Sequence, residues 1–333
     1  MMPLRSTGRI RNVSENLVSM SIGTSHMSSI LTNTSAMTAL QSLSNTNKSL
    51  SLTQNRIATG YRVNSAEDNA AYWSIATTMK SDRGALSTVK DALGLGAATI
   101  DVAYTGMNAA IDVTKEIKNK LVAARQPGVD REKIQSEITE LQNQLTSIAD
   151  SSVFSGENWL SVDSSATGYN ATKTMIASFS RSGGSVSVGT LSIDVDSVKL
   201  FDGNDQSGIL DSTDTTANGG VDYAVSDLDI SSLTDTDNDL ADLEQMIGYV
   251  DDAISGMTTA ASNLGAIKQR TTMQSEFVGA LMSAIDRGVG ALIDADMNEE
   301  STKLQALQVQ QALGIQALSI ANQNSQSILS LFR

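Results

Sequence analysis

The residues best suited to chemistry in this sequence form an acidic stretch, Asp235-Thr-Asp237-Asn-Asp239. Its alternating carboxylates are spaced like the first ligands of a calcium-binding loop, which also needs glycine at the sixth position and a bidentate glutamate at the twelfth. This sequence has Leu240 and Met246 at those two positions. The stretch therefore predicts a solvated acidic strand end rather than a calcium site.

The sequence gives little support for other catalytic or metal-binding motifs. With one histidine, His26, and no cysteine, we find no Ser-His-Asp or Cys-His arrangement, no zinc-binding His-Glu-x-x-His helix and no disulfide. Paired carboxylates of the glycosidase kind stay open, because the many aspartates offer chance pairs. Trp73 and Trp159 are interpreted as packing anchors. The sequence thus predicts no catalytic residue, cofactor or metal, and a protein that is not an enzyme.

Composition and charge narrow the class of partner. The net charge of −14 disfavours binding to a nucleic-acid backbone, because like charges repel. Much of it lies in residues 151–240, where 14 acidic and three basic residues give a net charge of −11. No apolar run approaches 18 residues, so we expect no membrane insertion. Two prolines and 4% aromatic residues favour long helices packed through aliphatic side chains.

Apolar residues recur with alternating gaps of three and four at both ends of the chain, which is the pattern of a narrow helical seam. These seams lie at 36–57, 86–121, 134–148, 243–264, 278–292 and 304–332. The fold class predicted is mainly α, with a long antiparallel coiled-coil-like bundle formed by the N- and C-terminal segments and a small β-rich surface insertion. Within 162–233 short alternating runs predict half-buried strands at 185–188 and 191–195, with turns at 183–184 and 202–203. The first and last seams contain Ala36, Leu40, Leu43, Asn47, Leu50, Gln54 and Ile57, and Leu304, Leu307, Gln311, Gly314, Leu318, Ala321, Ser325, Ile328 and Phe332.

Helix-breaking residues divide these seams. Gly60 can adopt a positive φ and end the first helix. Ser65, followed by Asp68, resembles a capping box that would start the next helix. Pro127-Gly128 predicts a turn at which the second and third helices become antiparallel.

The two terminal seams carry almost no charge. Lys48 is the only charged residue in 27–55, and Arg333 the only one in 304–333. A solvated helix normally carries charge on its exposed face, whereas these segments carry Ser, Thr, Asn and Gln. We therefore expect them to be buried by neighbouring copies of the chain; an ordinary intrachain coiled coil with a neutral face, or a floppy tail, is the alternative.

Several segments resemble bacterial flagellin, over residues 27–160 and 240–333. The stretches 72–79 and 296–301 are most similar to flagellins of soil (rhizobial) alphaproteobacteria. The segments that carry the resemblance are Ile30-Leu-Thr-Asn-Thr34, Ala58-Thr-Gly-Tyr-Arg62-Val-Asn64-Ser65-Ala66-Glu-Asp68-Asn-Ala70-Ala71, Phe154-Ser-Gly-Glu-Asn-Trp159-Leu and Ala317-Leu-Ser-Ile-Ala-Asn322-Gln-Asn-Ser-Gln326-Ser-Ile-Leu-Ser-Leu-Phe-Arg333.

The resemblance implies a subunit that polymerises into the extracellular flagellar filament for motility. It also implies export through the flagellar type III apparatus with a dedicated chaperone, and contacts with hook-associated and cap proteins. The expected organisation is a disordered, non-native or leader extension at 1–26, inner-tube helices at 27–62 and 299–333, outer-shell helices at 63–161 and 236–298, and a variable β-rich surface domain at 162–235.

The predicted assembly interface combines two kinds of residue. Seam periodicity and the lack of charge select Leu40, Leu43, Leu50, Ile57, Leu304, Leu307, Leu318, Ile328 and Phe332. The resemblance adds an intersubunit role for Arg62, Asn64 and Asp68.

Two other functions stay open from the sequence. A hook–filament junction protein is one, although that family usually has a Pro-Ser-Asp-Asp-Pro segment where this chain has Ser65-Ala-Glu-Asp-Asn69. The other is a surface domain that binds a carbohydrate or a cation.

Overall fold

The computed structural model describes residues 32–220 and 222–330. They belong to two compact units, one formed by residues up to Arg62 together with those from Ala295, and one formed by Val63–Asp294. We describe each unit by itself. The predictions for 1–26 and for Phe332 lie outside the described residues.

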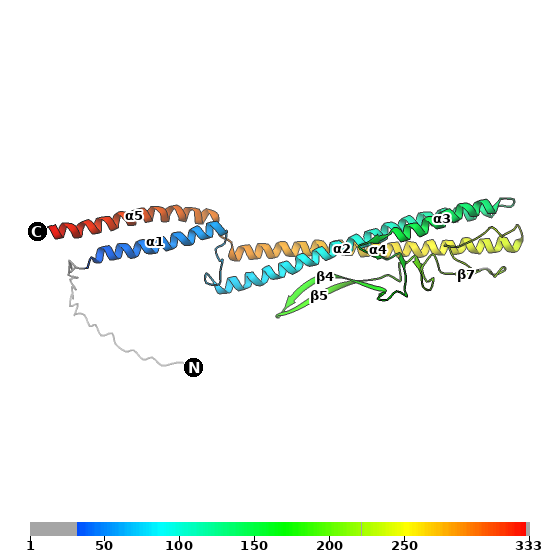
Figure 1. Cartoon of the computed structure of the whole chain (residues 1–333), viewed down its shortest axis with the longest axis horizontal. Helices are drawn as coiled ribbons and strands as arrows, with labels where there is room; N and C mark the ends of the chain where they lie inside the picture. The colour runs from blue at the N-terminus through cyan, green and yellow to red at the C-terminus, as the bar shows by residue number, and fades with distance from the viewer. Residues whose placement is uncertain (1–31, 221, 331–333) are drawn as a thin grey trace, which may run out of the picture. The chain divides into compact units, whose positions relative to one another are not determined.

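The first unit, described here over residues 32–62 and 295–330, is a pair of antiparallel helices, α1 (Thr34–Thr59) and α5 (Met297–Ser330). The helices run side by side (Figure 1). Contacts along the pair fix the direction. The Asn33 side chain donates to the Ala321 carbonyl at 3.0 Å, and the Arg56 guanidinium lies 3.0 Å from the Glu300 carboxylate at the opposite end.

The second unit contains three helices, α2 (Ala70–Ala124), α3 (Arg131–Ser151) and α4 (Asp237–Ile293). α2 and α4 are antiparallel neighbours, and α3 folds back along α2 (Figure 1). Ion pairs mark the register of α2 against α4: Arg83–Asp286 at 2.6 Å near one end and Arg125–Glu244 at 2.8 Å near the other. The mainly α prediction is confirmed.

Four helices begin at a residue with an extended backbone and a side-chain oxygen that accepts from the third helical N–H. These N-caps are Asn33, Asn69, Asp130 and Thr236. Each satisfies one of the free donors of the first helical turn, which stabilises a helix by about 1 kcal/mol. The helix starts are therefore determined locally.

The core of the second unit follows the predicted seams. The apolar stripe of α2 packs against the stripes of α3 and α4, and the inner residues are almost completely buried. Each such side chain contributes roughly 1.5–3 kcal/mol by leaving water. The fully buried seam residues include Ile100, Met107, Ile117, Leu121, Ile138, Leu145, Leu243, Val250, Met257 and Leu264.

Two predicted breaks are confirmed and one is corrected. Gly60 ends α1 with φ 74°, and its N–H bonds the Arg56 carbonyl at 2.8 Å. Gly128, with φ 81°, turns the chain between α2 and α3. Ser65 does not cap α2: the Asp68 carboxylate accepts the Ser65 N–H at 3.1 Å and closes a turn before Asn69 takes the capping position.

The strands form four two-stranded pairs. The largest is the hairpin of β4 (Thr172–Ser182) and β5 (Ser185–Asp194), joined at Gly183-Gly184, where both residues have positive φ as a tight turn requires. The remaining pairs are β1 (Val153–Phe154) with β2 (Glu157–Asn158), β3 (Ser161–Val162) parallel to β6 (Phe201–Asp202), and β7 (Asp214–Thr215) with β8 (Asp222–Tyr223).

Part of the strand prediction was wrong. The two predicted strands are one continuous strand, β5, and only its second half packs inward. Because side chains alternate along a strand, Leu191 and Ile193 on one face are buried, whereas Val186 and Val188 fall on the other face and are exposed.

The acidic stretch singled out first begins a helix rather than ending a strand. Asp235 accepts from the Arg131 guanidinium at 2.7 Å and from the Gly128 N–H at 3.1 Å, and α4 starts two residues later. Acidic residues are stabilising at this position because the helix N-terminus carries partial positive charge. The tryptophan interpretation holds for Trp159, which is buried, and fails for Trp73, which is exposed.

Candidate assembly surface

The first unit holds most of the residues predicted to form the interface. Leu43, Leu50 and Ile57 on α1 are half-buried, as are the predicted leucines on the antiparallel α5: Leu304, Leu307 and Leu318. Leu43 Cδ1 would lie 3.2 Å from a Cβ at Gly314, so a glycine on α5 permits the close approach. The structure thus brings these six residues to one helical pair.

The register of the α1 seam differs from the prediction at alternate positions. Thr46 and Thr53 are buried, at 7% and 2% exposure, whereas the predicted Asn47 and Gln54 are exposed. The Thr46 hydroxyl donates to the Ser42 carbonyl at 3.0 Å, so it is satisfied inside the seam. Threonine therefore occupies the buried positions of the seam, and the larger amide side chains lie at exposed positions beside it. Asn47 instead accepts from Gln311 of α5 at 2.8 Å.

Leu40 lies outside this seam and is more than half exposed. The predicted seam included it, but it belongs to an outer set of large apolar side chains, all more than half exposed. The seam analysis missed the other members of this set because they fall off its periodicity. Their signal in the sequence was large apolar residues on helical segments that carry very few charged residues. The set, which we call the outer apolar faces, is Met37, Leu40 and Leu52 on α1 and Val309, Leu313, Ile315 and Ile320 on α5.

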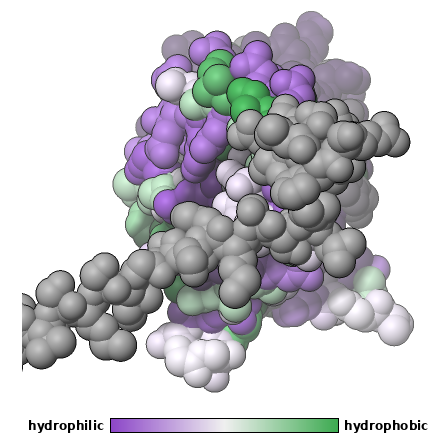
Figure 2. Space-filling model, turned by 90° about the vertical axis from the view of Figure 1, so that its left-hand side faces the viewer, coloured by the Kyte–Doolittle hydropathy of each residue, from purple (hydrophilic) through white to green (hydrophobic). Residues whose placement is uncertain are grey.

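Soluble proteins do expose single apolar residues, but repeated large ones on helices with very few charged residues indicate an interaction surface. Within 304–330 the helix α5 has no charged residue at all, and α1 has only Lys48 and Arg56. Figure 2 shows a face that is mostly hydrophilic, with small hydrophobic patches between the hydrophilic residues.

One ion pair interrupts this neutral unit. Arg56 lies 3.0 Å from Glu300, whose side chain is 7% exposed, while its other carboxylate oxygen is buried without a hydrogen-bond partner. Glu300 stands in the first turn of α5, where a carboxylate is favoured. The pair fixes the register of α1 against α5 at this end.

The three predicted loop residues fall in different places. Asn64 and Asp68 lie together, because the Asp68 carboxylate accepts the Asn64 N–H at 3.0 Å, and both are exposed. Arg62 is exposed and belongs to the first unit. Of Ile328 only the helical backbone is described, within α5.

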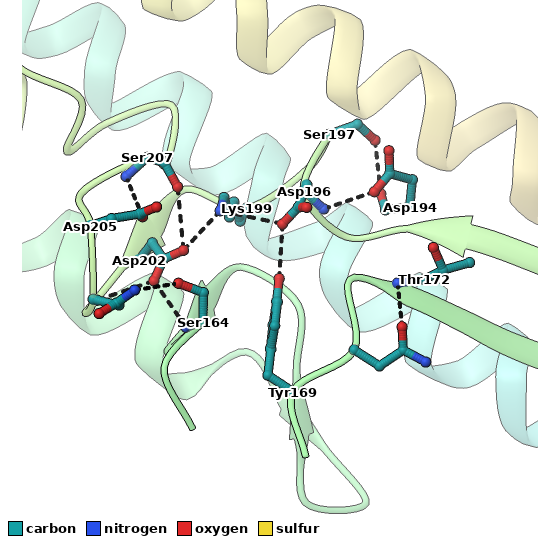
Figure 3. Close-up of polar contacts among 12 residues, drawn as sticks. Ser164, Tyr169, Thr172, Asp194, Asp196, Ser197, Lys199, Asp202, Asp205 and Ser207 are labelled. Atoms are coloured by element: carbon teal, nitrogen blue, oxygen red, sulfur yellow. Dashed lines mark hydrogen bonds and ion pairs between the residues drawn. The ribbon is translucent and has the colours of Figure 1, made fainter. Parts of the chain in front are cut away.

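The surface segment between α3 and α4 contains a buried charge cluster. Lys199 points between Asp196 and Asp202, and the Tyr169 hydroxyl donates to Asp196 at 2.9 Å (Figure 3). Burial raises the pKa of Tyr169, and the neighbouring Asp196 carboxylate raises it further, to about 12. Every charge in this cluster has a partner, so its role is to fix the fold of the segment.

No group of three or more His, Cys, Asp or Glu side chains that could hold a metal ion occurs in residues 32–220 and 222–330. Among the helices that the structure describes, none is long and apolar enough to cross a membrane.

Comparisons with known proteins match both helical ends. Residues 30–165 match the family model for the bacterial flagellin N-terminal helical region, and residues 247–332 match that for the C-terminal helical region. Flagellin C of Rhizobium meliloti (strain 1021) is 52% identical over 322 residues, covering 92% of this chain and 100% of that protein. Flagellin A of the same strain is 44% identical over 397 residues, with the same coverage. A flagellin of Brucella melitensis is 44% identical over 308 residues, again covering 92% and 100%.

Proposed function

This chain belongs to the bacterial flagellin family, and we propose that the α1–α5 pair is the part through which its copies join in the flagellar filament. A flagellin is a structural subunit that polymerises into the filament, not an enzyme, and flagellar filaments are extracellular. The proposal concerns which residues form the contact between copies, which we call the joint.

The observation that carries the proposal is the exposure of the outer apolar faces on helices that carry very few charged residues. Each of their side chains would contribute roughly 1.5–3 kcal/mol if a neighbouring copy buried it. Amide and hydroxyl side chains between them can hydrogen-bond across a tight contact without the desolvation cost of ions. Because the helices repeat this arrangement on α1 and on α5, one copy offers surfaces to more than one neighbour.

The half-buried seam residues have a second role in this proposal. They hold α1 against α5, and so present the outer apolar faces in a fixed register. Leu40 belongs to the joint directly, whereas Leu43, Leu50, Ile57, Leu304, Leu307 and Leu318 act by forming the pair. We further propose that Ile328 and Phe332 extend the α5 surface.

The remaining predictions complete the proposal. Residues 27–62 and 299–333 form the inner tube, 63–161 and 236–298 the next shell, and 162–235 the outer surface. Arg62, Asn64 and Asp68 take part in intersubunit contact. The chain leaves the cell through the flagellar type III export apparatus with a chaperone, and meets hook-associated and cap proteins. No observation favours the hook–filament junction or the carbohydrate-binding alternative.

The experiment introduces a charge into an outer apolar face. Leu313→Lys should abolish polymerisation while leaving the helical circular dichroism of the monomer unchanged, because the side chain is exposed before assembly. Val122→Lys is the matched control, since Val122 is a similarly exposed apolar residue on α2. Pelleting and electron microscopy measure the filaments. Normal filaments from Leu313→Lys would refute the proposal.

A further inference from the structure

A groove in the second unit lies between α2 and the β4–β5 hairpin and has a volume of about 390 Å³. Its wall on α2 includes Leu95, Gly96 and Thr99, and its wall on β4 includes Met175 and Ile176. The Met175 side chain packs directly against Gly96, since a Cβ at Gly96 would lie 2.6 Å from Met175 Cε. The volume falls within the range of sites that receive a ligand or a partner's side chain.

The two charged side chains of the groove are already paired with each other. Glu157 accepts from the Trp159 indole N–H at 3.2 Å with one oxygen and from Lys173 at 3.2 Å with the other. An entering polar ligand would have to compete with these bonds. The groove instead offers apolar wall, including the exposed Leu95 and Ile176, to an apolar occupant.

A ridge that matches the groove stands on α4 of the same chain. Met273 and Phe277 are one helical turn apart and therefore on one face, and they are 55% and 60% exposed. No residue of α4 lines the groove, so the ridge does not fill the groove of its own chain. Two large exposed apolar side chains at this spacing are typical of a helix that docks into a groove.

Ridge and groove lie at the same level along the α2–α4 pair. The ion pairs Arg83–Asp286 and Lys268–Asp101 bracket that level, with the groove residues of α2 between Arg83 and Asp101 and the ridge between Lys268 and Asp286. A neighbour displaced sideways, without a large shift along the helices, would therefore bring its ridge to this groove.

Charge also permits this contact. The chain as a whole carries −14, so most acidic surfaces of two copies repel each other. The groove contains one acid and one base, Glu157 and Lys173, and the ridge is flanked by one of each, Arg270 and Glu276. Both surfaces are locally neutral.

We infer that Met273 and Phe277 of one copy insert into the groove lined by Leu95, Gly96 and Ile176 of a neighbouring copy. This inference rests on the proposed function, because it adds a second joint to the same polymer. Ridge and groove are different surfaces of one chain, so each copy uses its ridge on one neighbour and its groove on another. Such a heterologous contact does not close on itself as a dimer does, and it generates a continuing assembly.

Cross-linking tests the contact directly, because the chain has no cysteine of its own. Leu95→Cys and Phe277→Cys are made as separate chains, mixed in equal amounts, polymerised with a kosmotropic salt and treated with a short bismaleimide. Cross-linked dimers should form in the mixed filaments. They should be absent from filaments of either variant alone and from the mixed monomers.

A matched control replaces the groove position by Val122→Cys, an equally exposed apolar site about 40 Å further along α2. Mixed filaments of Val122→Cys and Phe277→Cys should give no dimer. Filaments that form normally but give no dimer with Leu95→Cys, or as much dimer with Val122→Cys, would overturn the inference and leave the α1–α5 proposal intact.

Loss of the ridge gives a second readout. Met273→Ser/Phe277→Ser should raise the critical monomer concentration for polymerisation by about tenfold, the effect of a side chain central to an interface, with an unchanged monomer circular dichroism spectrum. An unchanged critical concentration would contradict the inference. Binding of an apolar probe such as decanoate in the groove of wild-type filaments would also contradict the inference, because the ridge of a neighbouring copy should already occupy that space.

Discussion

The ammonium nitrogen of Lys199 lies 2.8 Å from a carboxylate oxygen of Asp202, and the two side chains are only 7% and 0% exposed. Asp202 also accepts the N–H groups of Ser164 and Asn204 at 3.0 and 3.1 Å. Burial disfavours the charge on Lys199, but the hydrogen bonds that its ammonium donates to Asp202 and Asp196 outweigh this effect and raise the pKa of Lys199 to about 12. The pair therefore stays ionised throughout the neutral range and ties β6 to the neighbouring loops.

Breaking this pair should destabilise the surface segment. Lys199→Met removes the cation and leaves the Asp202 charge buried, which costs about 3 kcal/mol. Urea unfolding of the monomer, followed by tryptophan fluorescence in a Trp73→Phe background so that Trp159 is the reporter, measures the change. Lys268→Met is the control, because Lys268 forms an ion pair with Asp101 in which both side chains are substantially exposed, and such a pair contributes about 0–1 kcal/mol. Equal losses from both variants would contradict the prediction.

The same pair predicts the direction of an acid effect. Burial opposes ionisation of Asp202, but hydrogen bonds from Lys199, Ser164 and Asn204 outweigh it and hold the pKa of this carboxyl far below its ordinary value. A lowered folded-state pKa contributes stability above the unfolded-state value of about 3.9, and this stability is lost as the pH falls toward the folded value. The unfolding free energy should therefore fall below pH 4, and fall less in Asp202→Asn. Parallel acid profiles for the two proteins would refute this assignment.

Asp211 predicts the opposite trend. Burial raises its pKa, although one of its carboxylate oxygens accepts the Asp202 N–H at 2.6 Å, while the other is buried without a partner. A raised folded-state pKa gives stability below the unfolded value that is lost as the pH rises. Asp211→Asn keeps an accepting oxygen but cannot ionise, so it avoids the loss of unfolding free energy as the pH rises. The variant should therefore be more stable than the wild type at pH 7 and equally stable at pH 3. The control Asp229→Asn, at an exposed site, should leave the unfolding free energy unchanged at both pH 7 and pH 3.

How far the sequence predicts this fold depends on the range of the interactions involved. Helix seams and stops are local patterns, and Leu93, Ile117 and Leu145 are buried where the periodicity placed them. The choice between Asn47 and Thr46 for the α1 seam is decided by the partner helix and by hydroxyl bonding to the preceding turn, which the spacing does not contain. Likewise, the near absence of charged residues on α1 and α5 predicted a contact surface, but it did not predict which side chains lie outside the α1–α5 seam and are exposed.

The surface segment was harder to predict for the same reason. The sequence of β5 predicts two short strands because its apolar residues change face between Val188 and Leu191, whereas the backbone continues as one strand. The Lys199–Asp202 pair joins residues three apart, yet its burial depends on loops from Ser164 and Asn204 that close over it. Trp73 is exposed because the α2–α4 seam begins at neighbouring positions of the helix and leaves this face uncovered.

Gly60 gives the sharpest stability prediction in the first unit. Its φ of 74° ends α1, and nothing lies within 4 Å of the position a Cβ would take, so Gly60→Ala is opposed by backbone strain alone and should cost about 1 kcal/mol. Gly84, within α2, is equally open but helical, so Gly84→Ala should stabilise by about 0.5–1 kcal/mol through its better helix propensity. Because α1 and α5 are expected to gain most of their burial on assembly, the Gly60→Ala loss should appear as a lower melting temperature of filaments, measured by calorimetry, and the Gly84→Ala gain as a higher melting temperature of the monomer. A filament melting temperature unchanged by Gly60→Ala would mean that the end of α1 is not held in the left-handed conformation once copies assemble.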